Sequence, residues 1–340
     1  MSYDKVMRAA ASMPWMLAEE KLAEIEAMLQ VRLNGPVPIS AEDRERYAAA
    51  QAPRVAGGGG VGVLPVYGVL SQRMNLMAET SGGTSTEQLA TALRQLVADP
   101  QVAAIVLDVD SPGGNVYGID ELATEIRRAR GQKPIVAVAN SFMASAAYYL
   151  GSAANEIVVT PGGEVGSLGV FSLHLDVSEA EAAAGVRPTL IKAGKFKAEH
   201  SEHFPLTDEA RSHIEEDVAR YYEMFLAAVA TGRGVSVEAV RNGFGEGRVV
   251  GAKEAVRLGM ADKVATLQDT IARMQTPAGR GAIMRRGAVA EAEALALGDL
   301  SPEDKAAWLA SGRESFRAES AEAPAGDPGE VDARLRRLRI

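Results

Sequence analysis

The chain has 340 residues, 47% of them hydrophobic and 24% charged, which is the composition of an ordinary folded protein of one or two domains. Its formal net charge of −9 argues against a general nucleic-acid partner, and the lack of cysteine excludes disulfides, thiolate catalysis and cysteine–zinc sites. No apolar run approaches the roughly 20 residues that cross a bilayer, and the N-terminus lacks a signal-peptide pattern. We therefore expect a soluble, cytoplasmic protein without a membrane partner.

The first 35 residues are expected to form a helical extension ahead of the main domain. Apolar side chains recur at helical spacing between about residues 14 and 33. Three prolines and the run Gly57–Gly60 fall within residues 36–60, and both residue types interrupt regular structure. We interpret residues 36–60 as a flexible linker.

Strand-like and helical patterns alternate from residue 61 to residue 268, which we interpret as the main domain. Short apolar runs predict strands, and apolar residues three and four apart predict the helices between them. The predicted strands cover residues 61–70, 104–109, 134–139 and 156–160, and the predicted helices cover residues 85–98, a segment around 119–126 and a segment after 145. This order predicts parallel strands with helical crossovers, hence an α/β fold.

A long helix is predicted from about Thr207 to Thr231, with Thr207 as its N-cap and Gly232 as its stop. Its expected buried side carries Ile214, Val218, Tyr222, Phe225 and Val229. Residues 248–264 predict a short strand, a helix and a last strand. Residues 269–340 form a charged, Ala-rich tail, and beyond about residue 275 we expect it to be loosely ordered or scaffold-like rather than a second core.

One serine stands where a buried strand is predicted to meet a helix of small residues. Within Met143–Tyr149, Ser145 lies beside the unpaired N–H groups of a helix start, where a nucleophile and the oxyanion it creates are both served. Upstream, the sequence Asp-Ser-Pro-Gly-Gly of Asp110–Gly114 also follows a buried strand. Asp110 and Ser111 are themselves typical turn residues. Two such junctions together indicate a site, whereas either alone is more often a matter of packing.

A serine hydroxyl becomes a good nucleophile only when a base removes its proton. Histidine is the usual base, and the chain has His174, His200, His203 and His213. We interpret them as surface residues, and the spacing His200-x-x-His203 does not match a helical zinc pair, so no metal site is expected. Lysine can also act as the base when burial or a cationic neighbour favours its neutral form. The candidates are Lys192, Lys195 and Lys197.

Five motifs occur together in an order that one protease family also shows. They are Asp110–Gly114, Met143–Tyr149, Gly166–Val170, Gly194-x-x-Lys197 and Gly247–Asp262. Through them, residues 61–268 resemble the signal peptide peptidase A family of serine–lysine proteases, and within it the lambda-type phage head-maturation proteases. Two alanines follow Ser145 where bacterial signal peptide peptidases usually have two glycines, and no membrane anchor is expected here. Both differences favour the phage branch.

The resemblance implies a Clp protease- and crotonase-like fold of repeated β-β-α units. It implies Ser145 as the nucleophile, Lys197 as the general base, and the backbone amides of Gly113, Gly114 and Ala146 around the oxyanion hole. It implies no metal and no organic cofactor. Single-domain members of the family build each site between subunits, so we also expect a homo-oligomer in which a neighbouring chain donates the lysine.

The function expected from this resemblance is that of a serine endopeptidase acting on capsid-assembly proteins, such as a scaffold or portal protein, in the host cytoplasm or the procapsid. Three alternatives stay open. A cytoplasmic peptidase that degrades signal peptides belongs to the same family. A crotonase-like acyl-CoA enzyme shares the fold and does not need Lys197. A non-catalytic assembly scaffold would use the charged tail and would not need Ser145.

Overall fold

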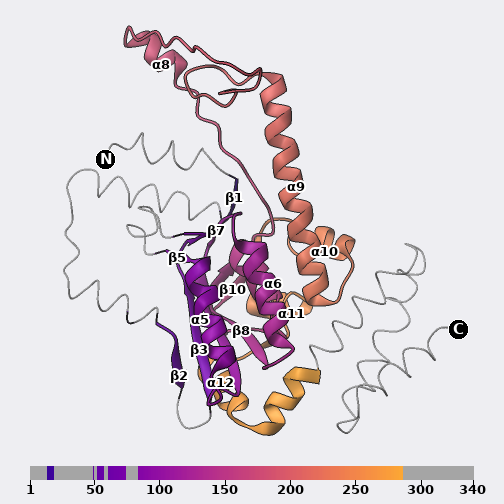
Figure 1. Ribbon diagram of the computed structural model, residues 1–340. Helices are drawn as coiled ribbons and strands as arrows, with labels where there is room; N and C mark the ends of the chain where they lie inside the picture. Colours follow the sequence, from indigo (N-terminus) through magenta and orange to yellow (C-terminus); the bar gives the residue numbers. More distant parts are fainter. Residues whose placement is uncertain (1–13, 19–48, 50–51, 57–59, 74–82, 286–340) are drawn as a thin grey trace, which may run out of the picture. The chain divides into compact units, whose positions relative to one another are not determined.

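A mostly parallel sheet forms the centre of the fold (Figure 1), in a computed structural model that describes residues 14–18, 49, 52–56, 60–73 and 83–285. The central strands are β3 (Val61–Tyr67), β6 (Ala104–Ser111), β8 (Ile135–Ala144) and β9 (Glu156–Val159), each parallel to its neighbour. The outer strands are β2 (Arg54–Ala56), β10 (Glu164–Gly166), β11 (Val249–Gly251) and β12 (Lys263–Val264). The strand order is β11-β10-β8-β6-β3-β2, with β9 paired to both β8 and β12. The expected α/β class is confirmed.

Both faces of this sheet are buried, which explains why its strands are continuous apolar runs. One face packs against the helices α5 (Thr86–Ala98), α6 (Ile119–Arg130) and α7 (Ala146–Ser152). The other face, with Val106 and Val136, packs against Leu267, Met274 and Ile283. These last three side chains belong to α12 (Leu267–Gln275) and to the helical residues 277–285.

The structure therefore moves the expected C-terminal boundary. Met274 and Ile283 are 0% and 1% exposed, so residues 269–285 belong to the main core and not to a loosely ordered tail. Arg273 adds a bidentate pair with the buried Glu156 of β9. The expectation of a tail is wrong for residues 269–285, because their apolar residues are too widely spaced among polar ones to stand out in the sequence. Residues 286–340 lie outside the described part of the chain.

A second, smaller sheet adjoins the first and has the order β1-β7-β4-β5. Its strands are β1 (Trp15–Leu17), β4 (Leu70–Ser71), β5 (Thr84–Ser85) and β7 (Gly113–Asn115). Thus β6 is followed by β7 and then α6, as expected for a β-β-α unit, whereas β3 is followed by β4, the short strand β5 and then α5. The helix expected from about residue 14 does not begin there, because Trp15–Leu17 instead pairs antiparallel with β7. Residues 19–33 lie outside the described part.

The remaining helices are α8 (Ser178–Ala183), α9 (Asp208–Arg233), α10 (Val237–Gly243) and α11 (Ala252–Arg257). The hydroxyl of Thr207 accepts a hydrogen bond from Ala210 N at 3.2 Å, so the predicted N-cap of α9 is confirmed. The predicted stop is wrong. The helix continues through Gly232, and Gly234 caps it with φ 63°. A Cβ on Gly232 would lie 2.1 Å from Ser152 O, so this glycine lets α9 approach α7 closely.

Candidate active site

Ser145 lies at the junction between β8 and α7 in a strained conformation. Its φ and ψ are 52° and −119°, outside the regions that side-chain-bearing residues ordinarily adopt. The backbone is fixed on both sides, since Ser145 N donates to Gly166 O at 2.7 Å and Ser145 O accepts from Tyr149 N at 2.9 Å. The residue is 0% exposed, and its Oγ has no hydrogen-bond partner among the described residues. The backbone of Ser145 is therefore fixed by hydrogen bonds, whereas its buried hydroxyl contributes none.

Small residues after Ser145 let α7 pack tightly beneath the site. Ala146 and Ala147 are fully buried, and a Cβ on Gly151 would meet Met143 Sδ at 2.4 Å. Two tyrosines then fix the helix: Tyr148 donates to Met260 O at 2.8 Å and Tyr149 to Asp120 Oδ1 at 2.7 Å. Burial raises the pKa of both phenols above the ordinary range, so both act as neutral donors.

The turn between β6 and β7 requires both of its glycines. Gly113 has φ +100°, and a Cβ on Gly114 would lie 1.9 Å from Leu70 O of β4. Ser111 Oγ donates to Gly68 O at 2.6 Å and accepts from Gly113 N at 3.2 Å, which is a turn-forming role. The Gly113 amide, one of the expected oxyanion donors, is therefore already engaged in the turn. Gly114 and Ala146 remain as the candidate donors.

The two motifs meet at Gly113. An ideal Cβ on this glycine would lie 2.9 Å from Ala146 N, 3.0 Å from Ser145 Cβ and 2.2 Å from the carbonyl oxygen of Met16. The structure therefore brings Ser145, Ala146 and the Gly-Gly turn together, as the sequence predicted. Met16, in β1, was not expected here.

The segment Gly166–Gly169 lies against the same junction. Besides the bond from Ser145 N to Gly166 O, Ser167 has φ 54° and its N–H donates to Arg248 O at 2.9 Å. Leu168 is buried in the main core. This segment therefore packs beside the serine and fixes the serine's backbone.

The predicted base does not reach the serine within one chain. The side chain of Lys197 is exposed, and its backbone N–H donates to Gly194 O at 3.2 Å. Because Ser145 Oγ has no partner among the described residues, Lys197 Nζ is not hydrogen-bonded to it. Lys195 Nζ instead pairs with Glu209 at 2.6 Å, and Lys192 Nζ donates to Lys195 O at 3.0 Å. All three lysines lie in residues 172–206, which we call the arm; it runs between the sheet and the start of α9 and includes α8 (Figure 1).

The histidines make local contacts away from Ser145. His203 Nδ1 lies 2.8 Å from Glu181 Oε1 of α8, and the rings of His200 and His213 stack at 6.0 Å. Across the described ranges, no group of three or more His, Cys, Asp or Glu side chains is placed to hold a metal ion.

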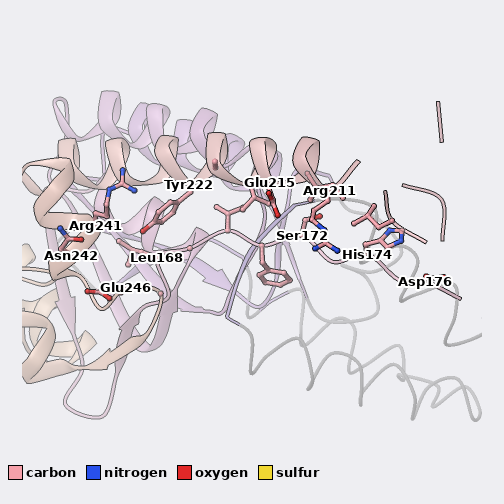
Figure 2. Close-up of a pocket in the computed structure, with 18 residues that line it drawn as sticks. Leu168, Ser172, His174, Asp176, Arg211, Glu215, Tyr222, Arg241, Asn242 and Glu246 are labelled. Atoms are coloured by element: carbon pink, nitrogen blue, oxygen red, sulfur yellow. The ribbon is translucent and has the colours of Figure 1, made fainter. Parts of the chain in front are cut away.

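A large groove of about 1160 Å³ runs along α9 and does not include Ser145 or Lys197 among its lining residues. Figure 2 shows Arg211, Glu215 and Tyr222 of α9 facing the extended segment that carries Ser172 and His174. Of the stripe predicted to be buried on α9, Phe225 and Val229 are fully buried. Ile214, Val218 and Tyr222 are only half-buried and line this groove.

Known proteins match the part of the chain that carries these motifs. The model of the family described as Peptidase family S49 matches residues 127–280, which include Ser145 and Lys197. The chain is 28% identical over 186 residues to the putative signal peptide peptidase SppA of Enterococcus faecium, covering 54% of each protein. The resemblance drawn from the sequence is therefore confirmed.

Two phage proteins are more similar still. The chain is 35% identical over 251 residues to the head-tail preconnector protein GP5 of Enterobacteria phage P21, covering 73% of this chain. It is 35% identical over 216 residues to the capsid assembly protease C of Escherichia phage lambda, covering 64% of this chain. This chain spans 49% of the length of each of these relatives.

Among solved structures, a ClpP1 mutant from Listeria monocytogenes overlaps 61% of this chain and 92% of its own, with 16% sequence identity and a TM-score of 0.37. Within the described ranges, the structure contains no helix that is long and apolar enough to cross a membrane.

Proposed function

We propose that this chain is a serine endopeptidase of phage head maturation in which Ser145 is the nucleophile. The observation that carries the proposal is the Ser145 hydroxyl itself: fully buried, unpartnered among the described residues, and set on strained backbone beside the Gly113–Gly114 turn. Burying a hydroxyl without a hydrogen bond costs about 1–3 kcal/mol, and strained backbone costs a similar amount. Such a combination persists where the hydroxyl must be free to react.

In the proposed reaction Ser145 Oγ adds to the carbonyl carbon of a peptide bond and passes its proton to Lys197 Nζ. The negative charge that develops on the carbonyl oxygen is stabilised by the N–H groups of Gly114 and Ala146. The C–N bond then breaks, and the leaving amine takes the proton back from the lysine. Water hydrolyses the ester and restores Ser145, so the net reaction consumes one water per bond cut.

Lys197 is proposed to come from a neighbouring chain. It must be neutral to accept a proton, which requires a buried setting, and it is exposed in a single chain. The arm around it also exposes large apolar side chains, among them Ile191, which is 93% exposed, and Phe196. Contact between arms and neighbouring chains would bury this surface and enclose the lysine.

The substrates are proposed to be capsid-assembly proteins, such as a scaffold or portal protein. Support comes from the names of the two phage relatives, a capsid assembly protease and a head-tail preconnector protein. A procapsid or the host cytoplasm is where such substrates are met. Peptide chemistry at Ser145 needs no metal and no organic cofactor.

A fluorophosphonate probe, which reacts with activated serines, tests the proposal. Wild type at high protein concentration is expected to be labelled and to cleave a candidate scaffold protein, whereas Ser145→Ala is expected to do neither. Ser141→Ala is the matched control, since this serine lies on the same strand and its Oγ bonds Asp110 instead. Loss of the nucleophile is expected to lower kcat by as much as about 10⁶-fold.

The alternatives give different results in the same assay. A wild type that is neither labelled nor active contradicts the protease proposal, and unchanged assembly in Ser145→Ala would then favour a scaffold. Thioester turnover that survives Lys197→Ala would favour an acyl-CoA enzyme. Cleavage of signal peptides in place of the scaffold protein would retain the chemistry and change only the substrate.

A further inference from the structure

Strand β1 lies between two stretches of backbone beside Ser145. On one side it pairs antiparallel with β7, and Ala18 N donates to Pro112 O at 3.0 Å. On the other side Trp15 N donates to Phe171 O at 2.8 Å and Trp15 O accepts from Phe171 N at 3.0 Å. A short extended segment held by backbone bonds on both edges is bound as a peptide strand is bound by strand addition.

The register of β1 places one particular carbonyl at the candidate oxyanion donors. Met16 stands opposite Gly114, and pairs in an antiparallel ladder alternate between hydrogen-bonded and non-bonded. Because Ala18 and Pro112 form a bonded pair, Met16 and Gly114, two residues along, form the next one. The Met16 oxygen also lies on the side of Gly113 that faces Ala146 N and Ser145 Cβ, as the contacts of an ideal Gly113 Cβ show.

Burial gives a second, independent observation. The residues Trp15, Met16, Leu17 and Ala18 are at most 5% exposed, so β1 fills its place completely. Ser145 Oγ beside it is buried and has no partner among the described residues. A free nucleophile buried next to a peptide carbonyl is the arrangement that precedes attack on that carbonyl.

We propose that β1 occupies the substrate-strand site as an internal substrate, so that the protein cuts itself between Met16 and Leu17; this rests on the function proposed above. The site then takes extended chains with large, unbranched or γ-branched apolar residues on both sides of the bond. An isolated chain holds β1 uncut, since Lys197 does not reach Ser145. Assembly supplies the lysine and starts the cut.

The step balances with water as the only co-reactant. Ser145 Oγ bonds to the Met16 carbonyl carbon while its proton passes to lysine. The bond from that carbon to Leu17 N breaks, and the new amine of Leu17 takes the proton. Water then releases residues 1–16 with a free carboxylate and restores the Ser145 hydroxyl.

Intact mass spectrometry of the full chain, incubated at high concentration, tests the proposal. Wild type is expected to yield a product that begins at Leu17, and Ser145→Ala is expected to stay whole. Met16→Asp is expected to slow the cut by about tenfold or more, because it places a carboxylate in a buried position. Val55→Asp is the control, since Val55 is 52% exposed in β2, and it is expected to cut at the wild-type rate.

Because Met16→Asp also removes an apolar contact, the same bond is tested in trans. A synthetic peptide with the sequence of residues 12–20 is expected to be cut by wild type between the residues that correspond to Met16 and Leu17, and a peptide with Asp in place of Met16 is not. One result would overturn this inference alone: wild type is labelled by the fluorophosphonate and cuts the scaffold protein, but it keeps residues 1–16 and leaves the peptide whole. No labelling and no cleavage of any substrate would overturn the proposed function as well.

Discussion

Ser145 shows how much of the candidate site depends on the conformation of single residues. Its positive φ turns the chain from β8 into α7 within one residue, and it does so without glycine. The cost is met by bonds on both sides of the residue and by the small side chains of α7. Gly113 and Gly114 have the complementary role, because a side chain at either position would meet backbone atoms. Neither glycine can be replaced without moving a strand.

Gly114→Ala is predicted to lower kcat/KM by about 10²–10³-fold, which is the usual effect of losing one oxyanion-hole donor. Its Cβ would lie 1.9 Å from Leu70 O, so β7 must shift and carry the amide with it. Gly131→Ala is the control, since its Cβ meets only Arg128 O at 3.6 Å. Cleavage rates and thermal unfolding of both variants are to be compared. Equal rates in Gly114→Ala and wild type would contradict the role given to this amide.

Tyr67 gives the protein a predicted weakness at alkaline pH. Burial, reinforced by the bond to Asp108, raises the pKa of Tyr67 to about 12 from its model-compound value of 10. Between these values the folded state keeps a proton that the unfolded chain loses, so the free energy of unfolding falls as pH rises. Tyr67→Phe is expected to flatten this fall, measured by urea unfolding across the same interval. A slope identical to that of wild type would show that other groups are responsible.

At the scale of elements, one ion pair fixes the end of α9 to the sheet. The side chains of Arg233 and Asp262 are 9% and 4% exposed and form two bonds, at 2.7 and 2.9 Å. Asp262 also accepts from Ile157 N of β9, and Arg233 donates to Gly259 O. Burial acts to lower the pKa of Arg233, but the charge and hydrogen bonds of the Asp262 carboxylate outweigh it, so the pKa is raised. The arm therefore leads into α9, a helix whose C-terminal end is fixed to the sheet by this ion pair.

Arg233→Met is predicted to lower the free energy of unfolding by about 3–5 kcal/mol, because it removes the cation that bonds a buried carboxylate. Arg220→Met is the matched control, since its pair with Asp217 is exposed and screened by solvent, and it is expected to lower the free energy of unfolding far less than Arg233→Met does. Urea unfolding measures both. Similar losses in the two variants would show that burial does not distinguish the pairs.

The elements that the sequence predicted well are those whose pattern is local. Strands β6 and β8 are apolar runs and were recognisable as such, although β8 extends beyond the predicted Ala139 to Ala144, where it pairs with β10. Strand β1 was missed because its state depends on β7, a partner about a hundred residues away in the chain. No local signal separates Trp15–Leu17 from the start of an amphipathic helix.

The site shows the same division. The family resemblance implied that Ser145, Ala146 and the Gly113–Gly114 turn form one group, and the structure places Gly113 of that turn against Ser145 and Ala146. The engagement of Gly113 N by Ser111 was not predictable, because it depends on one hydroxyl rotamer in the turn. The partner of Lys197 remains a prediction, since it is expected to lie on another chain.

The arm leaves the proposed base and several large apolar side chains exposed in the single chain. It carries the proposed base, and α8 within it buries no residue at all. Large apolar side chains that are exposed together on one segment, such as Ile191 and Phe196, mark a surface that another protein surface covers. The catalytic group and the exposed apolar surface therefore lie on the same segment, which ties activity to association.

Mixing two inactive variants is predicted to restore activity. If the lysine comes from a neighbour, Ser145→Ala and Lys197→Ala chains mixed in equal amounts form about a quarter of all sites with both groups intact. Scaffold cleavage by the mixture is to be compared with each variant alone. Ser145→Ala mixed with a double variant that carries both Ser145→Ala and Lys197→Ala is the matched control, and it is expected to stay inactive because neither chain keeps the serine. A mixture as inactive as its components would place both groups on one chain.

The position of β1 makes the proposed self-cleavage an irreversible record of assembly. Association of subunits is reversible and responds to dilution, but a peptide bond that has been hydrolysed is not remade under the same conditions. A chain that has once assembled and lost residues 1–16 would differ covalently from one that never did, even after the subunits separate. The population would therefore show hysteresis: diluted chains that had already been cut would regain activity on concentration without the delay that uncut chains require. The fraction of chains that begin at Leu17 would therefore measure the fraction that had ever assembled with another subunit.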